Sequence, residues 1–286
     1  MTDAVRIPEK VFREFDLPEE NYALVTNGYN SSTWISETYV VQAVHSQSLE
    51  HHDAVLQITQ SLRDLGQGIF PGLDFQKHPV IAESAWWRIS RRIEGPIANT
   101  LDQHRLKTYE ENYKSLLDDL TLLAGVEAPV SLPECTLSQN ISAEEILGWL
   151  EDIEEKEVTE TLNSLPAEPD SKIVVAHGDP LLKNIILSKK GVVLVDWESC
   201  QILPQLYDPG HNIANLLTGS KWGPPSSEEA LEAHRLLQLS ASYLGYELDD
   251  REITSLLAYA LFREAMLNQD DPHKLPKAKL ALEYIK

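Results

Sequence analysis

The sequence has few cysteines and no long apolar segment. Its two cysteines, Cys135 and Cys200, match no metal-ligand spacing and no disulfide framework, so we expect both thiols to be reduced. No stretch approaches the roughly 20 apolar residues that a membrane-spanning helix needs, and residues 1–10 hold no apolar signal-peptide core. These absences predict a soluble, cytoplasmic protein with no membrane partner.

Basic residues are also scarce. The 286 residues include 24 Lys and Arg against 45 Asp and Glu, which gives a formal net charge of −21. Because contacts to nucleic-acid phosphates need clustered Lys and Arg, this balance argues against a nucleic-acid partner. Negative charge of this size is typical of a solvated protein surface. No protein partner can be inferred from the sequence.

The most informative pattern lies between Ile173 and Glu198. An apolar run leads into His177-Gly178-Asp179-Pro180, and Asn184 follows five residues after Asp179. Two further apolar runs flank the turn at residues 189–191, and the second of them ends at Asp196. Lysines and a glycine between apolar runs are typical of a hairpin, so we expect Asp179, Asn184 and Asp196 to leave the ends of neighbouring extended segments. His-Gly-Asp alone would indicate no more than a turn.

Carboxylates and an amide in this arrangement suit phosphoryl transfer. The reaction needs positioning and charge neutralisation by Mg²⁺ more than it needs covalent chemistry from the protein. Mg²⁺ prefers hard oxygen ligands and keeps several waters, so Asn184 and Asp196 are a sufficient protein contribution. Asp179 is then the carboxylate that orients an acceptor hydroxyl and takes its proton.

With these residues the sequence resembles the aminoglycoside phosphotransferase and choline kinase-like family, relatives of the protein kinases. The resemblance covers the His-Gly-Asp triplet, Asn184, the Asp196-Trp-Glu triplet, and Asp208 preceded by a proline. It implies that Asp179 is the catalytic base and that Asn184 and Asp196 bind Mg²⁺. His177 and Asp208 would support the site without taking part in the chemistry.

The family implies a bilobal, protein-kinase-like α+β fold. Residues 1–94 would form a nucleotide-binding N-terminal lobe with a small antiparallel sheet, and residues 95–286 a larger, mainly helical lobe for catalysis and acceptor binding. Strand and helix patterns along the chain agree with this division. We expect strands at 22–26, 34–35, 38–44, 79–82 and 86–95, and helices at 49–65, 106–123, 142–162, from 226 onward and at 250–267, with Leu231, His234, Leu237 and Ala241 on the inner side of the helix from 226.

The resemblance also implies nucleotide contacts. Small polar residues in the turn from Asn27 to Ser32, among them Asn30 and Ser31, would let backbone amides approach phosphate oxygens. On the strand ending at Val44 the family commonly carries Lys or Arg, where this sequence has Gln42. Lys183 in the catalytic loop is then a candidate for the missing charge. The backbone of Ile93 is our candidate for contact with the base.

The co-substrate is expected to be ATP or GTP, and the acceptor a small molecule. The acidic stretch from Glu144 to Asp170 suits a cationic acceptor, such as an aminoglycoside or an amino alcohol, and is equally compatible with a solvated helix face. Two other functions remain open. Gln42 favours a catalytically weakened kinase fold that acts as a binding module. A metallophosphoesterase would need further histidine ligands in strand-end loops.

Overall fold

The structure, a computed structural model, describes residues 7–27, 31–44, 49–64, 80–82, 85–98, 105–129, 132, 170–189, 191–218 and 227–267. The chain divides into two compact units: Met1–Gly95 with Pro129–Ser131 (unit 1), and Pro96–Ala128 with Leu132–Lys286 (unit 2). None of the described helices is long and apolar enough to cross a membrane.

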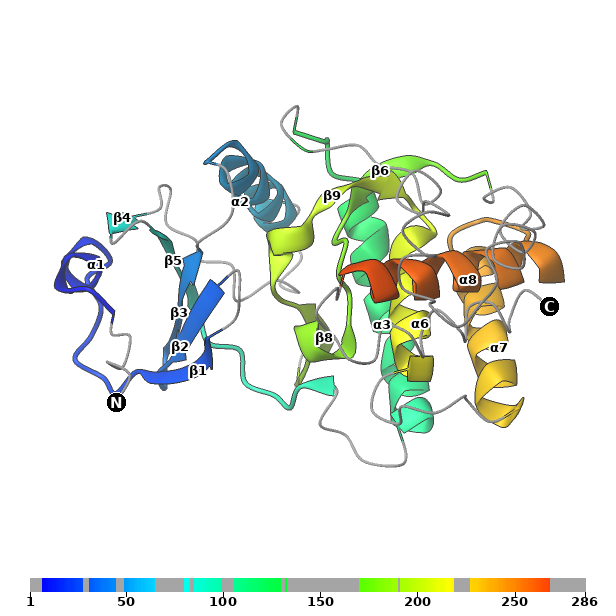
Figure 1. Cartoon of the computed structure of the whole chain (residues 1–286), viewed down its shortest axis with the longest axis horizontal. Coiled ribbons are helices and arrows are strands. Elements are labelled where there is room, and N and C mark those ends of the chain that lie inside the picture. The colour runs from blue at the N-terminus through cyan, green and yellow to red at the C-terminus, as the bar shows by residue number, and fades with distance from the viewer. Residues whose placement is uncertain are drawn as a thin grey trace, which may run out of the picture. The chain divides into compact units, whose positions relative to one another are not determined.

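Unit 1 is built on a five-stranded antiparallel sheet with the order β1-β2-β3-β5-β4 (Figure 1). Valine, isoleucine, threonine and tryptophan, which favour strands, make up much of these segments. The register places Gln42 of β3 opposite both Thr33 of β2 and Arg88 of β5. The strands are β1 (Ala23–Asn27), β2 (Ser31–Ile35), β3 (Tyr39–Val44), β4 (Val80–Ala82) and β5 (Ala85–Arg91).

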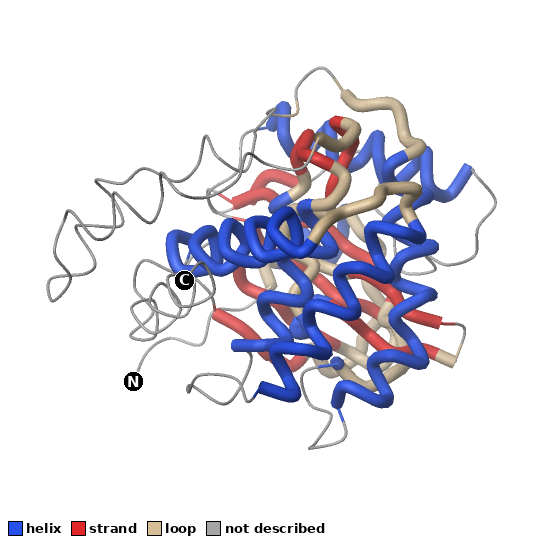
Figure 2. The backbone as a smooth tube through the Cα atoms, turned by 90° about the vertical axis from the view of Figure 1, so that its right-hand side faces the viewer, coloured by secondary structure: helices blue, strands red, loops and turns tan. Residues whose placement is uncertain are grey.

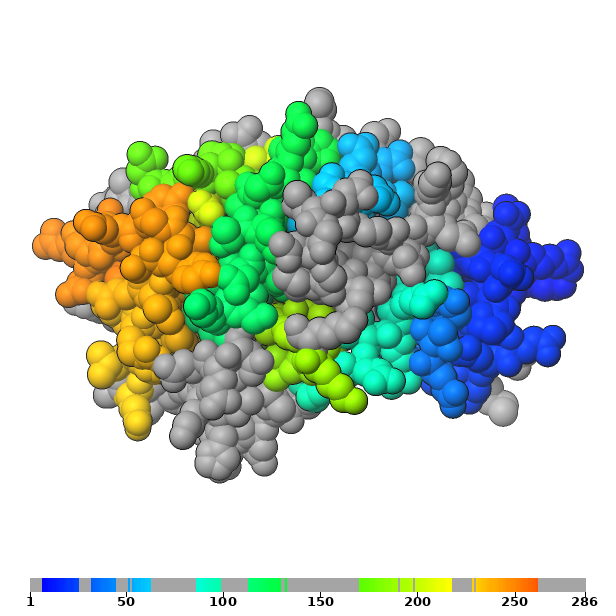
Figure 3. All heavy atoms as spheres, turned by 180° about the vertical axis from the view of Figure 1, so that it is seen from behind, coloured from blue at the N-terminus to red at the C-terminus, as the bar shows by residue number. Residues whose placement is uncertain are grey.

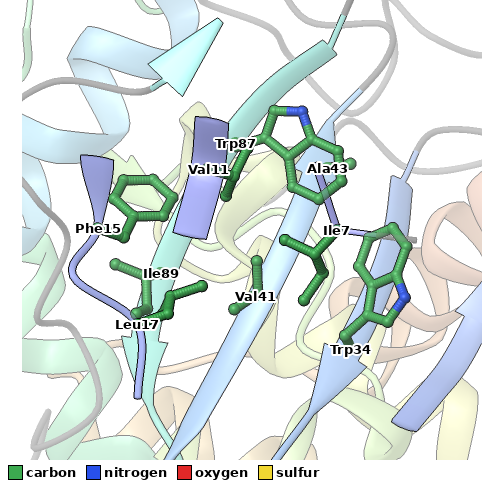
Figure 4. Packing of buried hydrophobic residues seen from close by; sticks show 9 residues of the cluster. All are labelled: Ile7, Val11, Phe15, Leu17, Trp34, Val41, Ala43, Trp87 and Ile89. Atoms are coloured by element: carbon green, nitrogen blue, oxygen red, sulfur yellow. The ribbon is translucent and has the colours of Figure 1, made fainter. Parts of the chain in front are cut away.

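The core of unit 1 lies between this sheet and α1 (Glu9–Glu14), a short helix that the sequence analysis did not predict. Trp34 and Trp87 stack on the sheet with ring centroids 5.2 Å apart. Figure 4 shows side chains from the sheet, from α1 and from the residues on either side of α1 converging in one buried cluster, which consists of Ile7, Val11, Phe15, Leu17, Trp34, Val41, Ala43, Trp87 and Ile89. The second helix, α2 (Leu49–Asp64), buries Ala54, Val55, Ile58 and Leu62 at three- and four-residue spacing.

Unit 2 contains four described α-helices. They are α3 (Arg105–Ala124), α6 (Tyr207–Thr218), α7 (Ser227–Tyr243) and α8 (Asp250–Leu267). Figures 1 and 2 show α8 running across α6 and α7, and it contacts both. Gly210 permits the close approach of α6 to α8, because a Cβ there would lie 3.1 Å from Leu256 Cγ. Figure 3 shows α3 beside α7 at the surface, and the buried Tyr113 and Ser240 hydroxyls join the two helices at 2.6 Å.

Two short antiparallel pairs of strands complete the described part of unit 2. The first pairs β6 (Ile173–Ala176) with β9 (Gln201–Pro204), and the second pairs β7 (Ile185–Ser188) with β8 (Gly191–Leu194). α3 packs on β6 and β8, and the Ser115 hydroxyl of α3 accepts a hydrogen bond from the Val192 N–H of β8 at 3.4 Å. The strand pairs hold the ends of the loops in which the predicted site residues lie.

Candidate active site

The loop that follows β6 carries His177, Gly178 and Asp179. Gly178 has φ +80°, a left-handed conformation that side chains rarely adopt. A Cβ at this position would lie 2.0 Å from the backbone oxygen of Ser199. The close passage of residues 177–179 over residue 199 therefore requires glycine.

Asp208, in the first turn of α6, fixes the backbone of this loop. Its Oδ2 accepts a hydrogen bond from the His177 N–H at 2.7 Å, and its Oδ1 accepts one from the Gly178 N–H at 3.0 Å. The side chain is buried, and burial raises the pKa of Asp208 while His177 and the two N–H groups oppose that rise. With both oxygens engaged in the fold, Asp208 is placed to hold the loop.

His177 is fully buried and joins the loop to the end of the hairpin. Its Nε2 lies 3.0 Å from the carbonyl oxygen of Val195, and its Nδ1 lies 3.4 Å from the backbone nitrogen of Asp179. A carbonyl only accepts and an N–H only donates, so the ring carries its proton on Nε2. The ring also packs against Trp197, with centroids 4.7 Å apart. These contacts make His177 part of the support of the loop.

Asn184 ends a single 3₁₀ turn (η3, Leu182–Asn184) and points back to Asp179. Its Nδ2 donates to the Asp179 carbonyl oxygen and to the Asp179 carboxylate Oδ2, both at 2.9 Å. Both of these hydrogen bonds come from the amide nitrogen, so the amide oxygen Oδ1 is the atom of this side chain that could bind a cation. Asn184 is buried, whereas Asp179 is only partly buried and can reach a ligand.

The β7–β8 hairpin brings Asp196 back to this region. Ile185 pairs with Leu194, and the Val195 N–H then donates to the Asn184 carbonyl oxygen at 2.9 Å. Asp196 follows with φ 66° and ψ 62°, a left-handed conformation in which Asp is tolerated better than most residues. This turn of the backbone begins the 3₁₀ helix η4 (Trp197–Ser199). Among the described residues there is no group of three or more His, Cys, Asp or Glu arranged to hold a metal.

Lys183 is the one predicted nucleotide-binding residue in this loop. Its Nζ lies 3.7 Å from Asp179 Oδ2, and 56% of its side chain is exposed. The ammonium end of this long ion pair is exposed and such a contact contributes little to stability, so the ammonium is available to a charged ligand.

The remaining predicted nucleotide-binding residues belong to unit 1. Asn30 lies outside the described residues. Ser31 begins β2, where its backbone pairs with Val44. Gln42 lies in the middle of β3 and contacts Thr33 and Arg88. Ile93 is half-buried in the segment between β5 and Gly95.

The model of the family described as "Phosphotransferase enzyme family" (APH) matches residues 24–247, which is most of the chain. The chain belongs to this phosphotransferase family. The predicted family resemblance is therefore confirmed. No single curated protein sequence matches the chain.

Solved structures share the fold of this phosphotransferase at low sequence identity. The GDP and kanamycin complex of APH(2")-IIia has a TM-score of 0.60 and 14% identity, covering 96% of each chain. A choline/ethanolamine kinase family protein from Mesorhizobium loti has a TM-score of 0.59 and 14% identity, covering 93% of this chain and 92% of that chain. A ternary complex of APH(4)-Ia with ADP and hygromycin B has a TM-score of 0.60 and 13% identity, covering 96% of this chain and 95% of that chain. The predicted bilobal, kinase-like α+β fold is confirmed.

Helix α6 supplies further loop contacts in this phosphotransferase that the sequence analysis missed. The Asn212 amide nitrogen donates to the Pro180 carbonyl oxygen, and Asn215 Oδ1 accepts from the Leu182 N–H at 3.1 Å. The Tyr207 hydroxyl donates to the Gly178 carbonyl oxygen at 3.4 Å. Polar residues recur at three- and four-residue spacing from 208 to 215. This periodicity could have predicted a helix whose polar face contacts the loop.

Proposed function

We propose that this phosphotransferase transfers the γ-phosphoryl group of ATP or GTP, with Mg²⁺, to a hydroxyl group of a small molecule. The observation that carries the proposal is the Asn184 amide, which lies 2.9 Å from the Asp179 carboxylate in a loop held by Asp208. A carboxylate oriented by a fixed donor suits a general base. We assign nucleotide binding to residues 1–94, and catalysis with acceptor binding to residues 95–286.

The proposed step uses Asp179 as the base. The acceptor oxygen attacks the γ-phosphorus as its proton passes to the Asp179 carboxylate, and a new O–P bond forms. The bond between the γ-phosphorus and the bridging oxygen breaks, and its electron pair leaves with the nucleoside diphosphate. Lys183, beside Asp179, offers positive charge to the phosphates. His177 and Asp208 keep the loop in place.

The donor set at the hairpin fits a magnesium ion. Asn184 is held by its amide nitrogen, which directs the hard amide oxygen away from Asp179, and Asp196 adds a carboxylate at the start of η4. When bound there, Mg²⁺ would neutralise charge on the nucleotide phosphates. Two protein ligands suffice for Mg²⁺ where phosphates and water supply the rest.

The neighbouring structures support the proposed substrates. One is a complex with GDP and kanamycin, another is a complex with ADP and hygromycin B, and a third protein belongs to the choline/ethanolamine kinase family. Both kinds of nucleotide are therefore candidates here, with aminoglycosides and amino alcohols as candidate acceptors. The acidic stretch from Glu144 to Asp170 suits a cationic acceptor and equally a solvated helix face, and its residues 144–169 lie outside the described residues.

Calorimetric titration with ATP and with GTP, each with and without Mg²⁺, tests the proposal first. We expect Mg²⁺-dependent binding of at least one nucleotide, followed by phosphorylation of a compound from an aminoglycoside and amino-alcohol panel. Asp179→Asn is the control, because an amide oxygen at 179 still accepts from Asn184. It should bind the nucleotide like the wild type and lose turnover. Absence of nucleotide binding by the folded wild type would contradict the proposal.

A further inference from the structure

Two asparagines of α6 bind the backbone of the loop on either side of Leu181. The Asn212 amide nitrogen donates to the Pro180 carbonyl oxygen at 2.5 Å, and Asn215 Oδ1 accepts from the Leu182 N–H at 3.1 Å. A carbonyl only accepts and a backbone N–H only donates, so these partners decide which end of each amide faces the loop. Asn212 therefore acts as a donor and Asn215 as an acceptor.

The two asparagines share a helix face with Asp208. Asn212 follows Asp208 by four residues and Asn215 follows Asn212 by three, which is the spacing of one side of an α-helix. Asp208 accepts from the Gly178 N–H, and Asn212 donates to Pro180. The helix thus holds the backbone just before Asp179 and just after it. Pro180 and Asn212 are both buried, so water does not compete for this contact.

Asn215 caps the 3₁₀ turn η3 from outside the loop. The first N–H groups of a helix have no partner within it, and here the first is that of Leu182. The residue before it, Leu181, has no side-chain oxygen that could accept. Asn215 supplies the acceptor from α6. Because η3 ends at Asn184, the cap fixes the turn that brings the Asn184 amide to Asp179.

We propose that Asn212 and Asn215 are positioning residues for phosphoryl transfer: Asn212 holds Asp179 through the Pro180 carbonyl, and Asn215 holds Asn184 by capping η3. Neither side chain acts on the substrate itself. This inference rests on the proposed function, because the base and the magnesium ligand are those of that reaction. A displacement of about 1 Å in a catalytic group can cost about 100-fold in rate, so both contacts should be visible in kcat.

The test makes the same substitution at both positions. Asn212→Asp loses the donor and sets a carboxylate against the Pro180 carbonyl, so its kcat should fall about 10- to 100-fold. Asn215→Asp keeps an acceptor for the Leu182 N–H and should retain most of its kcat, whereas Asn215→Leu, which has no acceptor, should lose it. Gln238→Glu is the matched control, since it makes the same amide-to-acid change at an exposed position of α7. Kanamycin, hygromycin B, choline and ethanolamine serve as acceptors, with ATP or GTP and Mg²⁺.

Two measurements separate positioning from a general loss of structure. In calorimetry, Asn212→Asp should bind the nucleotide with Mg²⁺ as the wild type does. Asn215→Leu should keep the affinity measured without Mg²⁺ and lose part of the gain that Mg²⁺ brings, because Asn184 is a proposed ligand. In the protein without nucleotide or metal, amide hydrogen exchange of Leu182 should be faster in Asn215→Leu and unchanged in Asn215→Asp.

Wild-type kcat in Asn212→Asp and in Asn215→Leu would overturn the inference while leaving the proposed function intact. Equal losses of kcat in the two aspartate variants would overturn the donor and acceptor roles. A parallel loss of nucleotide affinity and kcat in Asn212→Asp would mark a structural role and would also overturn it. If Asn212→Asp does not fold, Asn212→Ala decides, since it removes the donor without adding charge. A wild type that binds no nucleotide and phosphorylates no acceptor would instead contradict the proposed function.

Discussion

The side-chain amide of Asn184 holds Asp179 at two points, the backbone carbonyl and the carboxylate, each 2.9 Å from the amide nitrogen. One side chain thereby fixes both the path of the loop and the orientation of its acid. In the proposed reaction the same residue also presents its amide oxygen to Mg²⁺. Substitutions at this position can separate these roles.

We expect Asn184→Ala and Asn184→Asp to lower kcat by about 100-fold or more, because an oriented general base contributes about 10²- to 10⁴-fold to rate. Asn184→Asp keeps an oxygen ligand, so its rate should still saturate at the wild-type Mg²⁺ concentration, whereas Asn184→Ala should need more Mg²⁺. Initial rates across a Mg²⁺ series would show this. Full turnover by Asn184→Asp would mean that the amide N–H group does not orient the base.

Asp208→Asn should destabilise unit 2 by about 1–3 kcal/mol, because a buried backbone N–H would lose its carboxylate acceptor and meet an amide N–H instead. Urea unfolding measures the change, and kcat should fall in the same variant as the loop shifts. An unchanged unfolding free energy would show that the two hydrogen bonds are not needed for the loop conformation.

Gly178→Ala should abolish turnover and strongly destabilise the protein, since the added Cβ would lie 2.0 Å from the Ser199 carbonyl oxygen. Gly245→Ala is the matched control: its φ is +86°, and a Cβ there meets nothing within 4 Å. The control carries only the conformational cost of about 1–2 kcal/mol. Thermal unfolding of both variants measures the difference, and equal losses would exclude the clash as the cause.

Asp119 should make stability depend on pH. It is buried in α3, and neither of its carboxylate oxygens has a hydrogen-bond partner in the described part of the chain. Burial, and to a smaller extent repulsion from Asp118, raises its pKa to about 8. Between pH 4 and 8 the folded chain therefore keeps a proton that the unfolded chain has released. This contribution to stability is complete below pH 4 and is lost as pH rises through 8.

Asp119→Asn, which cannot ionise, should be stabilised relative to the wild type by an amount that grows from pH 5 to pH 9. Unfolding midpoints at pH 5, 7 and 9 would measure that gap. Glu127→Gln, an exposed substitution just beyond the end of α3, serves as the control and should follow the wild type. Parallel curves for Asp119→Asn and the wild type would contradict the prediction.

The helices expected at 49–65, 106–123 and 250–267 were predictable from their apolar faces, and the strands of unit 1 from their β-branched and aromatic residues, whereas the helix expected at 142–162 lies outside the described residues. The helix expected at 250–267 has those bounds, and the apolar face expected on the helix from 106 is buried in α3. α1 is too short to show a period, and α6 was hidden because its buried residues include polar side chains, among them Asp208 and His211. The prediction that Leu231 faces inward is wrong, because this residue lies in the second turn of α7 and is 72% exposed.

The spacing of Asp179 and Asn184 predicted that the two side chains would lie together, because a short turn leaves little freedom between them, and the hydrogen bond between them is present. The contact between Gln42 and Arg88 was not predictable in the same way. The two residues are 46 positions apart, and only the strand register makes them neighbours. From the sequence alone, Gln42 has no neighbouring positive charge, whereas in the fold the Arg88 guanidinium lies beside it.

The pairing of β6 with β9 bears on when the site forms during synthesis. A growing chain that ends at Glu198 already contains every residue of the motif, from His177 to Asp196. It still lacks β9, the partner of β6, and Asp208, the acceptor for the loop backbone. Until translation has passed the start of α6, the growing chain contains the β7–β8 hairpin and the Asn184–Asp179 contact but lacks β9 and Asp208. We therefore expect the ability to act on a substrate to arrive after the residues of the motif have been made.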